Sequence, residues 1–373
     1  MKKLTILIVG AFPKPSNRVI FGGVVSSCRA LVSSTLVENF NLLLLDSTQK
    51  SNPAPSLIIR LPFAFKRLLV YCGKLWNERP DIVLIFTSSG FSLLEKGLMG
   101  RIALFLQKST LIFPRSGVII EQFSNSSFQR CLIRWALGNS TKLLCQGDAW
   151  HNFAVRELKY PQENAPVIHN WTATKELLAI GQSKIELDIN DPVKLLFLGW
   201  LEEKKGIFEL LESCLQLNEK TRFSLVVAGK GNAEERAMEF VKDNGLVEKV
   251  DFRGWVEGNK LEKLFMECDV LVLPSWAEGL PNAMIEAMAA GLAVVVSAVG
   301  NVPSVMTDGK NGLLIPPRDV DALTKALFSL IEDPVFLKKL AMSGHTMARD
   351  NFSISRAVGK LEKIFNEIKI GIN

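Results

Sequence analysis

Residues 194–199, Lys-Leu-Leu-Phe-Leu-Gly, and residues 4–10, Leu-Thr-Ile-Leu-Ile-Val-Gly, decide the fold of this chain. Each is a short apolar run that ends at a glycine turn, which is typical of a strand buried on both faces of a sheet. Each also opens a series of similar runs separated by helical patterns. Strands that alternate with helices form parallel sheets, so we predict an α/β chain with two doubly wound, Rossmann-like domains.

The predicted strands fall into two groups. The first group is Leu4–Val9, Asn41–Leu45, Ile82–Phe86, Thr110–Phe113 and Lys142–Cys145. The second group is Lys194–Leu198, Ser224–Ala228, Val250–Phe252, Asp269–Leu273, Ala293–Ser297 and Leu313–Ile315.

A length of 373 residues suits two domains, and a polar, turn-rich segment separates the two groups of strands. We therefore predict an N-terminal domain over residues 1–170, a linker over 171–192 and a C-terminal domain over 193–352. A final helix over 353–373 is expected to pack back toward the N-terminal domain. Ligands of open α/β sheets bind beyond the carboxyl ends of the strands, so the expected site is a central cleft that both domains face.

Composition excludes several classes of protein. Apolar residues make up 48% and charged residues 22%, which is incompatible with global disorder. The six cysteines form no CxxC pair and no histidine lies at metal spacing from them, so reduced thiols in a cytoplasmic protein are expected. The first apolar run is too short for a signal peptide, and no run is long enough for a membrane-spanning helix.

Charge is divided unevenly along the chain. Residues 1–170 carry 20 Lys and Arg against 9 Asp and Glu, whereas residues 171–373 carry 24 against 29. The overall charge of +6 is thus the sum of +11 and −5. This division predicts that the first half meets an anionic partner. No nucleic-acid-binding motif accompanies the charge, so an anionic membrane surface is the expected partner and nucleic acid is not.

Three predicted helices in the first half combine Lys and Arg with aromatic residues, over residues 63–76, 91–108 and 128–135. Basic helices of this kind can lie on an anionic membrane face. The alternative is that they are ordinary solvated helices that pack one face on a sheet.

Residues 273–291, Leu-Pro-Ser-Trp-Ala-Glu-Gly-Leu-Pro-Asn-Ala-Met-Ile-Glu-Ala-Met-Ala-Ala-Gly, are the stretch with the clearest chemistry. A strand gives way to a loop with Glu278 and Gly279, and then to a short helix that carries Glu286 and stops at Gly291. The two carboxylates bracket a helix N-terminus, which offers free N–H groups and a positive dipole end to a phosphate. Carboxylates on either side of a phosphate suit sugar hydroxyls. The alternative is a solvated Glu278 and a Glu286 that caps its own helix.

This stretch resembles the E-x7-E motif of retaining GT-B glycosyltransferases of the family 4 type, also called glycosyl transferases group 1. Further resemblances are Phe197-Leu198-Gly199 with Lys205-Gly206, Val226 to Gly231, Val250 to Gly254, Asp308 to Leu314 and the Gly22-Gly23 loop. They cover most of residues 192–352, whereas in residues 1–170 only the fold pattern and Gly22-Gly23 contribute.

The resemblance implies a role for each matching residue. Glu278 would hold the donor sugar, Lys205 would neutralise the leaving diphosphate and Glu286 would accept hydrogen bonds from the nucleotide ribose. The remaining donor-binding residues would be Gly22, Gly23, Gly199, Trp200, Gly229, Arg253, Gly279, Leu280, Pro281 and Asn282. Arg115 and Ser116 would line the acceptor or the donor sugar. Fixed cations and N–H groups stabilise the leaving phosphate, so no metal ion or other cofactor is expected.

The implied reaction moves a sugar from a nucleotide diphosphate sugar to an acceptor hydroxyl with retention of configuration. A lipid-diphosphate-linked acceptor in bacterial surface polysaccharide synthesis is expected, on the inner face of the cytoplasmic membrane. The sequence departs from the family at Trp200, where Arg is usual, at Ser304, where Glu is usual, and at Phe113 to Gly117, where a His is usual. These departures leave an alternative open, a non-catalytic GT-B-like binding or scaffold protein.

Two other motifs favour structural explanations. Asp319-Val320-Asp321 has the form of a metal-binding DxD, but acids at a helix start explain it better. Gly229-x-Gly231 lacks the third glycine of a dinucleotide fingerprint, so NAD is not expected.

Overall fold

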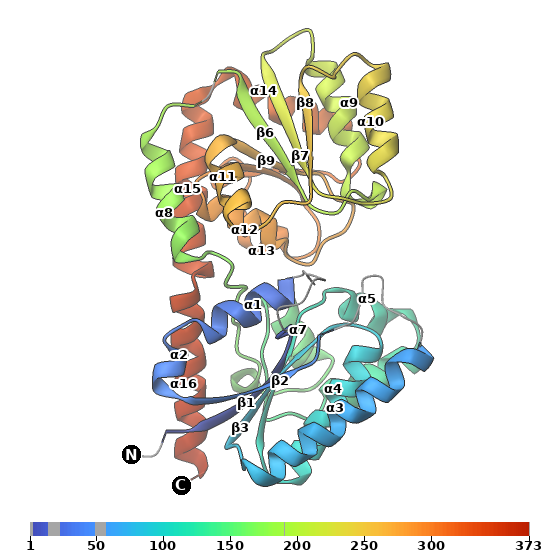
Figure 1. Ribbon diagram of the computed structural model, residues 1–373, viewed down its shortest axis with the longest axis vertical. Helices are drawn as coiled ribbons and strands as arrows, with labels where there is room; N and C mark the ends of the chain where they lie inside the picture. Colours follow the sequence, from blue (N-terminus) through green and yellow to red (C-terminus); the bar gives the residue numbers. More distant parts are fainter. Residues whose placement is uncertain (1–2, 14–22, 49–56, 190, 373) are drawn as a thin grey trace. The chain divides into compact units, whose positions relative to one another are not determined.

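The computed structural model describes residues 3–13, 23–48, 57–189 and 191–372. By its internal contacts the chain divides into unit 1, which comprises Met1–Trp171 and Ile354–Asn373, and unit 2, which comprises Thr172–Ser353. Each unit contains one parallel sheet with helices (Figure 1). The prediction of two doubly wound, Rossmann-like α/β domains is therefore confirmed.

The sheet of unit 1 has the strand order β2-β1-β3-β4-β5. Its strands are β1 (Thr5–Gly10), β2 (Asn41–Asp46), β3 (Ile82–Thr87), β4 (Ser109–Pro114) and β5 (Lys142–Leu143). Its helices are α1 (Gly23–Val32), α2 (Leu36–Asn39), α3 (Leu57–Asn77), α4 (Phe91–Phe105), α5 (Val118–Asn125), α6 (Ser127–Leu137), α7 (Asp148–Arg156), the 3-10 turn η1 (Gln162–Asn164) and α16 (Ile354–Ile372). The strand order reverses between β1 and β3, which is the switch point of this topology.

The sheet of unit 2 has the order β11-β10-β9-β6-β7-β8. Its strands are β6 (Val193–Leu198), β7 (Phe223–Ala228), β8 (Val250–Gly254), β9 (Val270–Leu273), β10 (Ala293–Ser297) and β11 (Leu313–Ile315). Its helices are α8 (Lys175–Glu186), the 3-10 turn η2 (Glu203–Lys205), α9 (Ile207–Leu217), α10 (Glu234–Asp243), α11 (Asn259–Glu267), α12 (Asn282–Ala289), α13 (Val302–Val305), α14 (Val320–Glu332) and α15 (Pro334–Phe352).

The central strands of both sheets are buried on their two faces, as the continuous apolar runs predicted, whereas the edge strands β2 and β8 keep exposed residues. In β6, Leu195 and Phe197 enter one apolar cluster, whereas Leu196 enters the cluster on the opposite face. In β1, Leu7 and Ile8 divide in the same way. Alternate residues of a strand point to opposite faces, so a strand covered on both sides must be apolar throughout. Each predicted strand has its counterpart among the described residues.

The order of strands in unit 2 determines where its loops meet. The order reverses between β6 and β9, which are neighbours in the sheet although β7 and β8 separate them in the sequence. The loops that follow β6 and β9 therefore leave the same edge of the sheet at its switch point. These two loops contain Lys205 and Glu278, the two residues predicted to act on the donor.

Candidate functional site

Lys205 and Glu278 form an ion pair in unit 2. The Nζ atom of Lys205 donates to Oε1 of Glu278 at 2.6 Å. Both side chains are half-buried, with 24% and 18% of their surface exposed. Partial burial weakens the screening of such a pair by water, so each charge holds the other in a defined position. The sequence motifs gave these residues separate partners in a donor and did not predict that they pair with each other.

The loop with Glu278 is joined to the turn with Lys205 through the backbone. The N–H of Trp276 donates to the carbonyl of Lys204 at 2.9 Å. Gly206 has a φ of 77°, and a Cβ atom there would lie 2.2 Å from the carbonyl oxygen of Pro274. Only glycine permits this approach, so the resemblance at Lys205-Gly206 has a physical reason.

Trp276 anchors the same loop through its side chain. Its indole Nε1 donates to Oε1 of Glu209 at 2.6 Å, and the guanidinium of Arg318 lies over its ring at 4.1 Å from the centroid. Cation–π stacking and a charge-assisted hydrogen bond both fix the ring. Sequence motifs missed Trp276, Glu209 and Arg318, because the three lie on elements that are far apart in the chain.

A second turn holds the loop from the other side. The N–H of Asn301 donates to the carbonyl of Gly279 at 2.7 Å. Gly300 has a φ of 57°, and a Cβ atom there would lie 1.9 Å from the carbonyl oxygen of Glu278. The loop is therefore fixed by backbone contacts on two sides.

Helix α12 begins directly after this loop. Its N-cap residue is Pro281, which provides no side-chain hydrogen bond to the first turn. The N–H groups of a first turn without such a cap are suited to an anion. The predicted residues Gly279, Leu280, Pro281 and Asn282 make up the loop end and the first position of the helix.

Glu286 lies in the second turn of α12 and is half-buried. Burial raises the pKa of its carboxyl to about 7. Loss of water disfavours the charged form of a carboxylate, so Glu286 changes its charge near neutral pH. The alternative from the sequence, that Glu286 caps its own helix, is wrong, because the N-terminal cap position is occupied by Pro281.

Two tryptophans follow strand ends in the same sheet. Trp200 comes shortly after β6 and Trp255 directly after β8, and their ring centroids are 5.0 Å apart at an interplanar angle of 45°. Trp200 is 41% exposed. The sequence motifs placed Trp200 among the donor-binding residues, at the position where arginine is usual, and did not single out Trp255. An exposed aromatic surface of this kind suits stacking on a base or on a sugar face.

The other residues predicted in unit 2 lie at strand ends. The N–H of Gly199 donates to the carbonyl of Ala228 at 3.0 Å, and the N–H of Gly229 to that of Gly254 at 2.8 Å. The guanidinium of Arg253 is bonded to Asp251 Oδ2 at 2.8 Å and to Glu267 Oε2 at 2.6 Å. These bonds raise the pKa of Arg253, so the cation is already paired with two carboxylates.

Arg115 and Ser116 lie in unit 1, directly after β4. Nη2 of Arg115 donates to Oγ of Ser27 at 2.8 Å, and its guanidinium stacks on the rings of Phe113 and Trp171. Burial lowers the pKa of Arg115 to about 10, and among the described residues its buried Nη1 has no hydrogen-bond partner. A buried donor without a partner is suited to an acceptor group of a ligand. Gly23 is the first residue of α1, and Gly22 lies outside the described residues.

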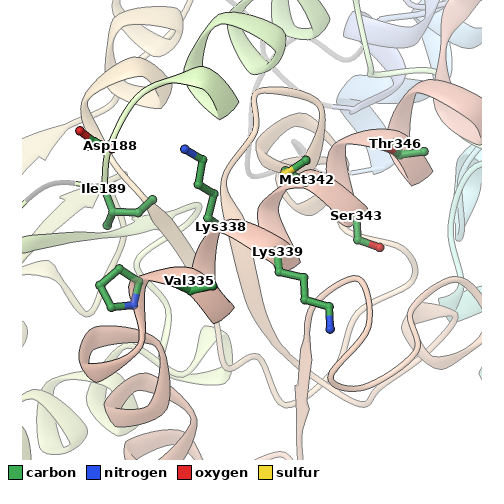
Figure 2. A pocket seen from close by; sticks show the side chains of 9 residues that line it. Asp188, Ile189, Val335, Lys338, Lys339, Met342, Ser343 and Thr346 are labelled. Carbon is green, nitrogen blue, oxygen red and sulfur yellow. The ribbon is translucent and has the colours of Figure 1, made fainter.

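A groove of about 640 Å³ lies elsewhere in unit 2, beside α15 (Figure 2). Its lining includes Ile189, Lys338, Lys339 and Met342 and none of the residues predicted to bind the donor.

The Asp319-Val320-Asp321 motif has a structural role. Asp319 accepts a hydrogen bond from the N–H of Ala322 at 2.8 Å, so it caps α14, as predicted from the sequence. Within the described ranges no group of three or more His, Cys, Asp or Glu side chains could hold a metal ion.

Residues 181–347 match the family model described as glycosyl transferases group 1. This segment includes the Lys205–Glu278 pair and helix α12. The chain is thus similar to the glycosyl transferases group 1 family over most of unit 2.

Curated relatives of the chain include two uncharacterized glycosyltransferases of Methanocaldococcus jannaschii. One is 33% identical over 144 residues, 39% of this chain and 37% of the relative. The other is 26% identical over 360 residues, 93% of this chain and 95% of the relative. A lipopolysaccharide core biosynthesis glycosyltransferase, LpsE of Rhizobium meliloti, is 28% identical over 187 residues, 50% of this chain and 53% of the relative. The chain thus matches some relatives over about half their length or less and others almost completely.

Solved structures also share the fold of this chain. A sucrose-phosphate synthase from Thermosynechococcus elongatus has a TM-score of 0.74 at 18% identity, with 99% of this chain and 100% of the other covered. Anabaena HepE in complex with UDP-glucose has a TM-score of 0.68 at 16% identity, with 98% and 100% covered.

Proposed function

We propose that this chain is a retaining glycosyltransferase of the family 4 type, within the glycosyl transferases group 1. It transfers a sugar from a nucleotide diphosphate sugar to an acceptor hydroxyl and needs no metal ion. The observation that carries the proposal is the Lys205–Glu278 ion pair beside the N-terminus of α12, which carries no side-chain cap from Pro281. Anabaena HepE, which shares the fold, is described in complex with UDP and with UDP-glucose, which supports a donor of this class.

Lys205 and Glu278 act in two steps of the proposed transfer, the binding of the donor and the departure of its diphosphate. A donor diphosphate draws Lys205 toward its negative charge, which frees the carboxylate of Glu278 to accept a hydrogen bond from the donor sugar. As the bond between the anomeric carbon of the sugar and the diphosphate oxygen breaks, negative charge grows on the leaving nucleotide diphosphate. Lys205 and the N–H groups of the first turn of α12 lie ready to stabilise that charge, which is how preorganised donors lower a barrier.

Glu286 and the two tryptophans complete the donor site. In its charged form Glu286 accepts hydrogen bonds from the ribose hydroxyls, and the Trp200–Trp255 surface stacks on the base. Trp200 offers no cation where the family usually has arginine, so Lys205 carries more of the diphosphate charge. In unit 1, Nη1 of Arg115, which has no partner among the residues that the structure describes, binds an oxygen of the acceptor, with Ser116 next to it in the sequence.

We further propose that the acceptor is a lipid-diphosphate-linked glycan of a bacterial surface polysaccharide. The relative LpsE is named for lipopolysaccharide core biosynthesis, and two others are named for colanic acid and amylovoran biosynthesis. The excess of positive charge over residues 1–170 suits an acceptor diphosphate in an anionic membrane. The chain would then work in the cytoplasm, on the inner face of the cytoplasmic membrane. Within the described part of the chain no helix is both long and apolar enough to cross a bilayer.

Thermal shift with a panel of UDP- and GDP-sugars identifies the donor, because a ligand that binds the folded state raises its melting temperature. With that donor, release of nucleotide diphosphate measures turnover. Glu278→Gln is expected to lower kcat/KM by about 10²–10³, and Lys205→Ala by a similar factor. Lys204→Ala is the matched control. Lys204 is 64% exposed and paired with Glu202, so its removal should change kcat/KM less than about twofold.

The turnover assay also distinguishes this proposal from the alternative of a non-catalytic binding protein. That alternative is favoured by Trp200, which stands where the family usually has arginine. A binding protein would give a thermal shift with the donor and no turnover. Equal turnover by wild type and Glu278→Gln would refute the role of Glu278. Retention is checked on the product, whose anomeric coupling constant in the proton NMR spectrum must match that of the donor.

A further inference from the structure

Helix α3 of unit 1 exposes apolar side chains where a helix of a soluble domain exposes polar ones. It runs along the outside of unit 1 beside α4 (Figure 1). Its exposed large apolar residues are Ile59, Leu61, Phe63, Phe65, Leu69, Val70 and Trp76. Trp76 is 73% exposed and Phe65 64%. An apolar surface of this extent on one element marks a contact with a partner.

The orientation of α3 is fixed by the opposite face of the helix. Tyr71 is buried and its hydroxyl donates to the carbonyl of Met99 in α4 at 2.9 Å. Arg67 is bonded to the half-buried Glu95 of α4 at 2.6 Å. Ala64 and Leu75 are also buried. The helix therefore cannot turn its apolar face inward without losing a buried hydrogen bond and an ion pair.

Helix α4 extends the same apolar surface at one end. Arg67 pairs with Glu95 and Tyr71 with Met99, a constant offset of 28 residues. The two helices thus run parallel, and Phe105 at the end of α4 lies at the level of Asn77 at the end of α3. Phe105 is 87% exposed. Trp76 and Phe105 place two large aromatic rings at the same end of the surface.

Charge decides which partner fits. Residues 57–77 contain the cations Arg60, Lys66, Arg67 and Lys74 and no Asp or Glu. A second copy of the chain would bring the same positive charge to the contact and be repelled. Anionic lipid headgroups complement it. Apolar and aromatic side chains with interspersed cations on one helix are the pattern of a helix that lies in the plane of a membrane interface.

We propose that the outward face of α3, with Phe105 of α4, contacts the anionic surface of a bilayer. The helix is 21 residues long, or about 31 Å, and lies along the surface with Phe65, Leu69 and Trp76 among the lipid headgroups and upper acyl chains. Lys66, which is exposed among these residues, binds lipid phosphate. This inference rests on the proposed function in one respect, since it brings unit 1 to the bilayer that holds the lipid-linked acceptor.

Flotation of the full chain with lipid vesicles tests the proposal. Wild type is expected to bind vesicles of phosphatidylcholine with 30% phosphatidylglycerol at low salt, and more weakly vesicles of phosphatidylcholine alone. Binding should persist in part at about 0.5 M NaCl, because apolar contacts are not screened. The triple variant Phe65→Ser, Leu69→Ser, Trp76→Ser should lower the partition coefficient at least tenfold.

A matched double variant, Val247→Ser with Val335→Ser, removes two exposed apolar side chains from unit 2, at 59% and 80% exposure. It should bind vesicles within about twofold of wild type. Melting curves check that both variants fold, which is expected because the substituted side chains are exposed. Equal binding by the triple variant and wild type, or no binding by wild type, would overturn the proposal. So would a dimer of wild type in sedimentation velocity without lipid that the triple variant abolishes.

The donor assay distinguishes this inference from the proposed function. The triple variant should keep the thermal shift produced by the nucleotide sugar, because Phe65, Leu69 and Trp76 are not among the residues assigned to the donor. Vesicle binding by a chain that shows neither a donor shift nor turnover would leave the surface standing and refute the proposed function. Turnover by a chain that does not bind vesicles would support the proposed function and refute the membrane-contacting surface on α3.

Discussion

Glu286 is the group in the candidate site whose charge changes near neutral pH. Burial raises its pKa to about 7 from an ordinary value of 4.5. A carboxyl with a raised pKa binds its proton more tightly in the folded state than in the unfolded state. Its contribution to stability is therefore complete below pH 4.5 and is lost as the pH rises through about 7.

Glu286→Gln should remove this loss, because glutamine keeps the shape of the side chain and carries no charge. Between pH 5 and pH 8 the free energy of unfolding of unit 2 in wild type should fall by ~1–3 kcal/mol relative to the variant. Urea unfolding of both proteins at several pH values measures the difference. Parallel pH profiles would contradict the shifted pKa. The variant should also bind the donor more weakly above pH 7, where wild type presents a carboxylate to the ribose.

Sequence motifs identify single residues of the candidate site, but they do not predict which distant residues contact each other. Glu278, Glu286 and Lys205 could be found because each lies at fixed spacing within a local motif. The ion pair between Lys205 and Glu278 could not be predicted, because the two residues are 73 positions apart in the sequence and meet only through the strand order of the sheet. Trp255 and the Trp276–Glu209 bond carry no local pattern and are visible only in the structure.

Among the elements, the loop between β9 and α12 is held by turns on two sides, at Gly206 and at Gly300. Gly300 packs against the carbonyl of Glu278, where an added Cβ atom would lie at 1.9 Å. Gly300→Ala should therefore displace the loop and lower kcat/KM by roughly tenfold or more, since a displacement of about 1 Å can cost 10²-fold. Turnover with the identified donor measures this effect.

Gly309→Ala is the control for backbone strain. Gly309 also has a positive φ, 68°, but an added Cβ atom there would meet nothing within 4 Å. This variant should lose about 1 kcal/mol of stability and keep its turnover. If both variants lose activity equally, the contact between Gly300 and Glu278 does not position the loop.

Elements were the most predictable level of the molecule. Strands buried on both faces give continuous apolar runs, and each of these runs is a strand in the structure. The helix over residues 63–76 was also predicted, as was its basic and aromatic composition. Which of its faces is exposed depends on Tyr71 and Arg67 pairing with α4, and no periodicity in α3 alone contains that information.

For the whole molecule, the chain's last helix completes the core of unit 1. Leu361, Ile364 and Phe365 of α16 belong to the same apolar cluster as Ile6 and Ile8 of β1. Phe365 meets the ring of Phe40 edge-on at 5.3 Å, and Lys360 donates to the carbonyl of Val167 at 3.0 Å. Unit 1 is thus assembled from both ends of the sequence, whereas unit 2 is continuous.

This assembly predicts that a change in α16 destabilises unit 1 and leaves unit 2 intact. Phe365→Ala removes a fully buried ring and should cost unit 1 about 3–5 kcal/mol, which lowers its melting temperature by roughly 10 °C. Calorimetry with and without the nucleotide sugar resolves the two units, because Lys205, Glu278 and Glu286 lie in unit 2 and the donor should raise the transition of that unit more. The control Ile370→Ala changes a residue of the same helix that is 78% exposed, and should shift neither transition by more than about 2 °C. A shift of the donor-sensitive transition in Phe365→Ala, or none at all, would mean that α16 does not belong to the core of unit 1.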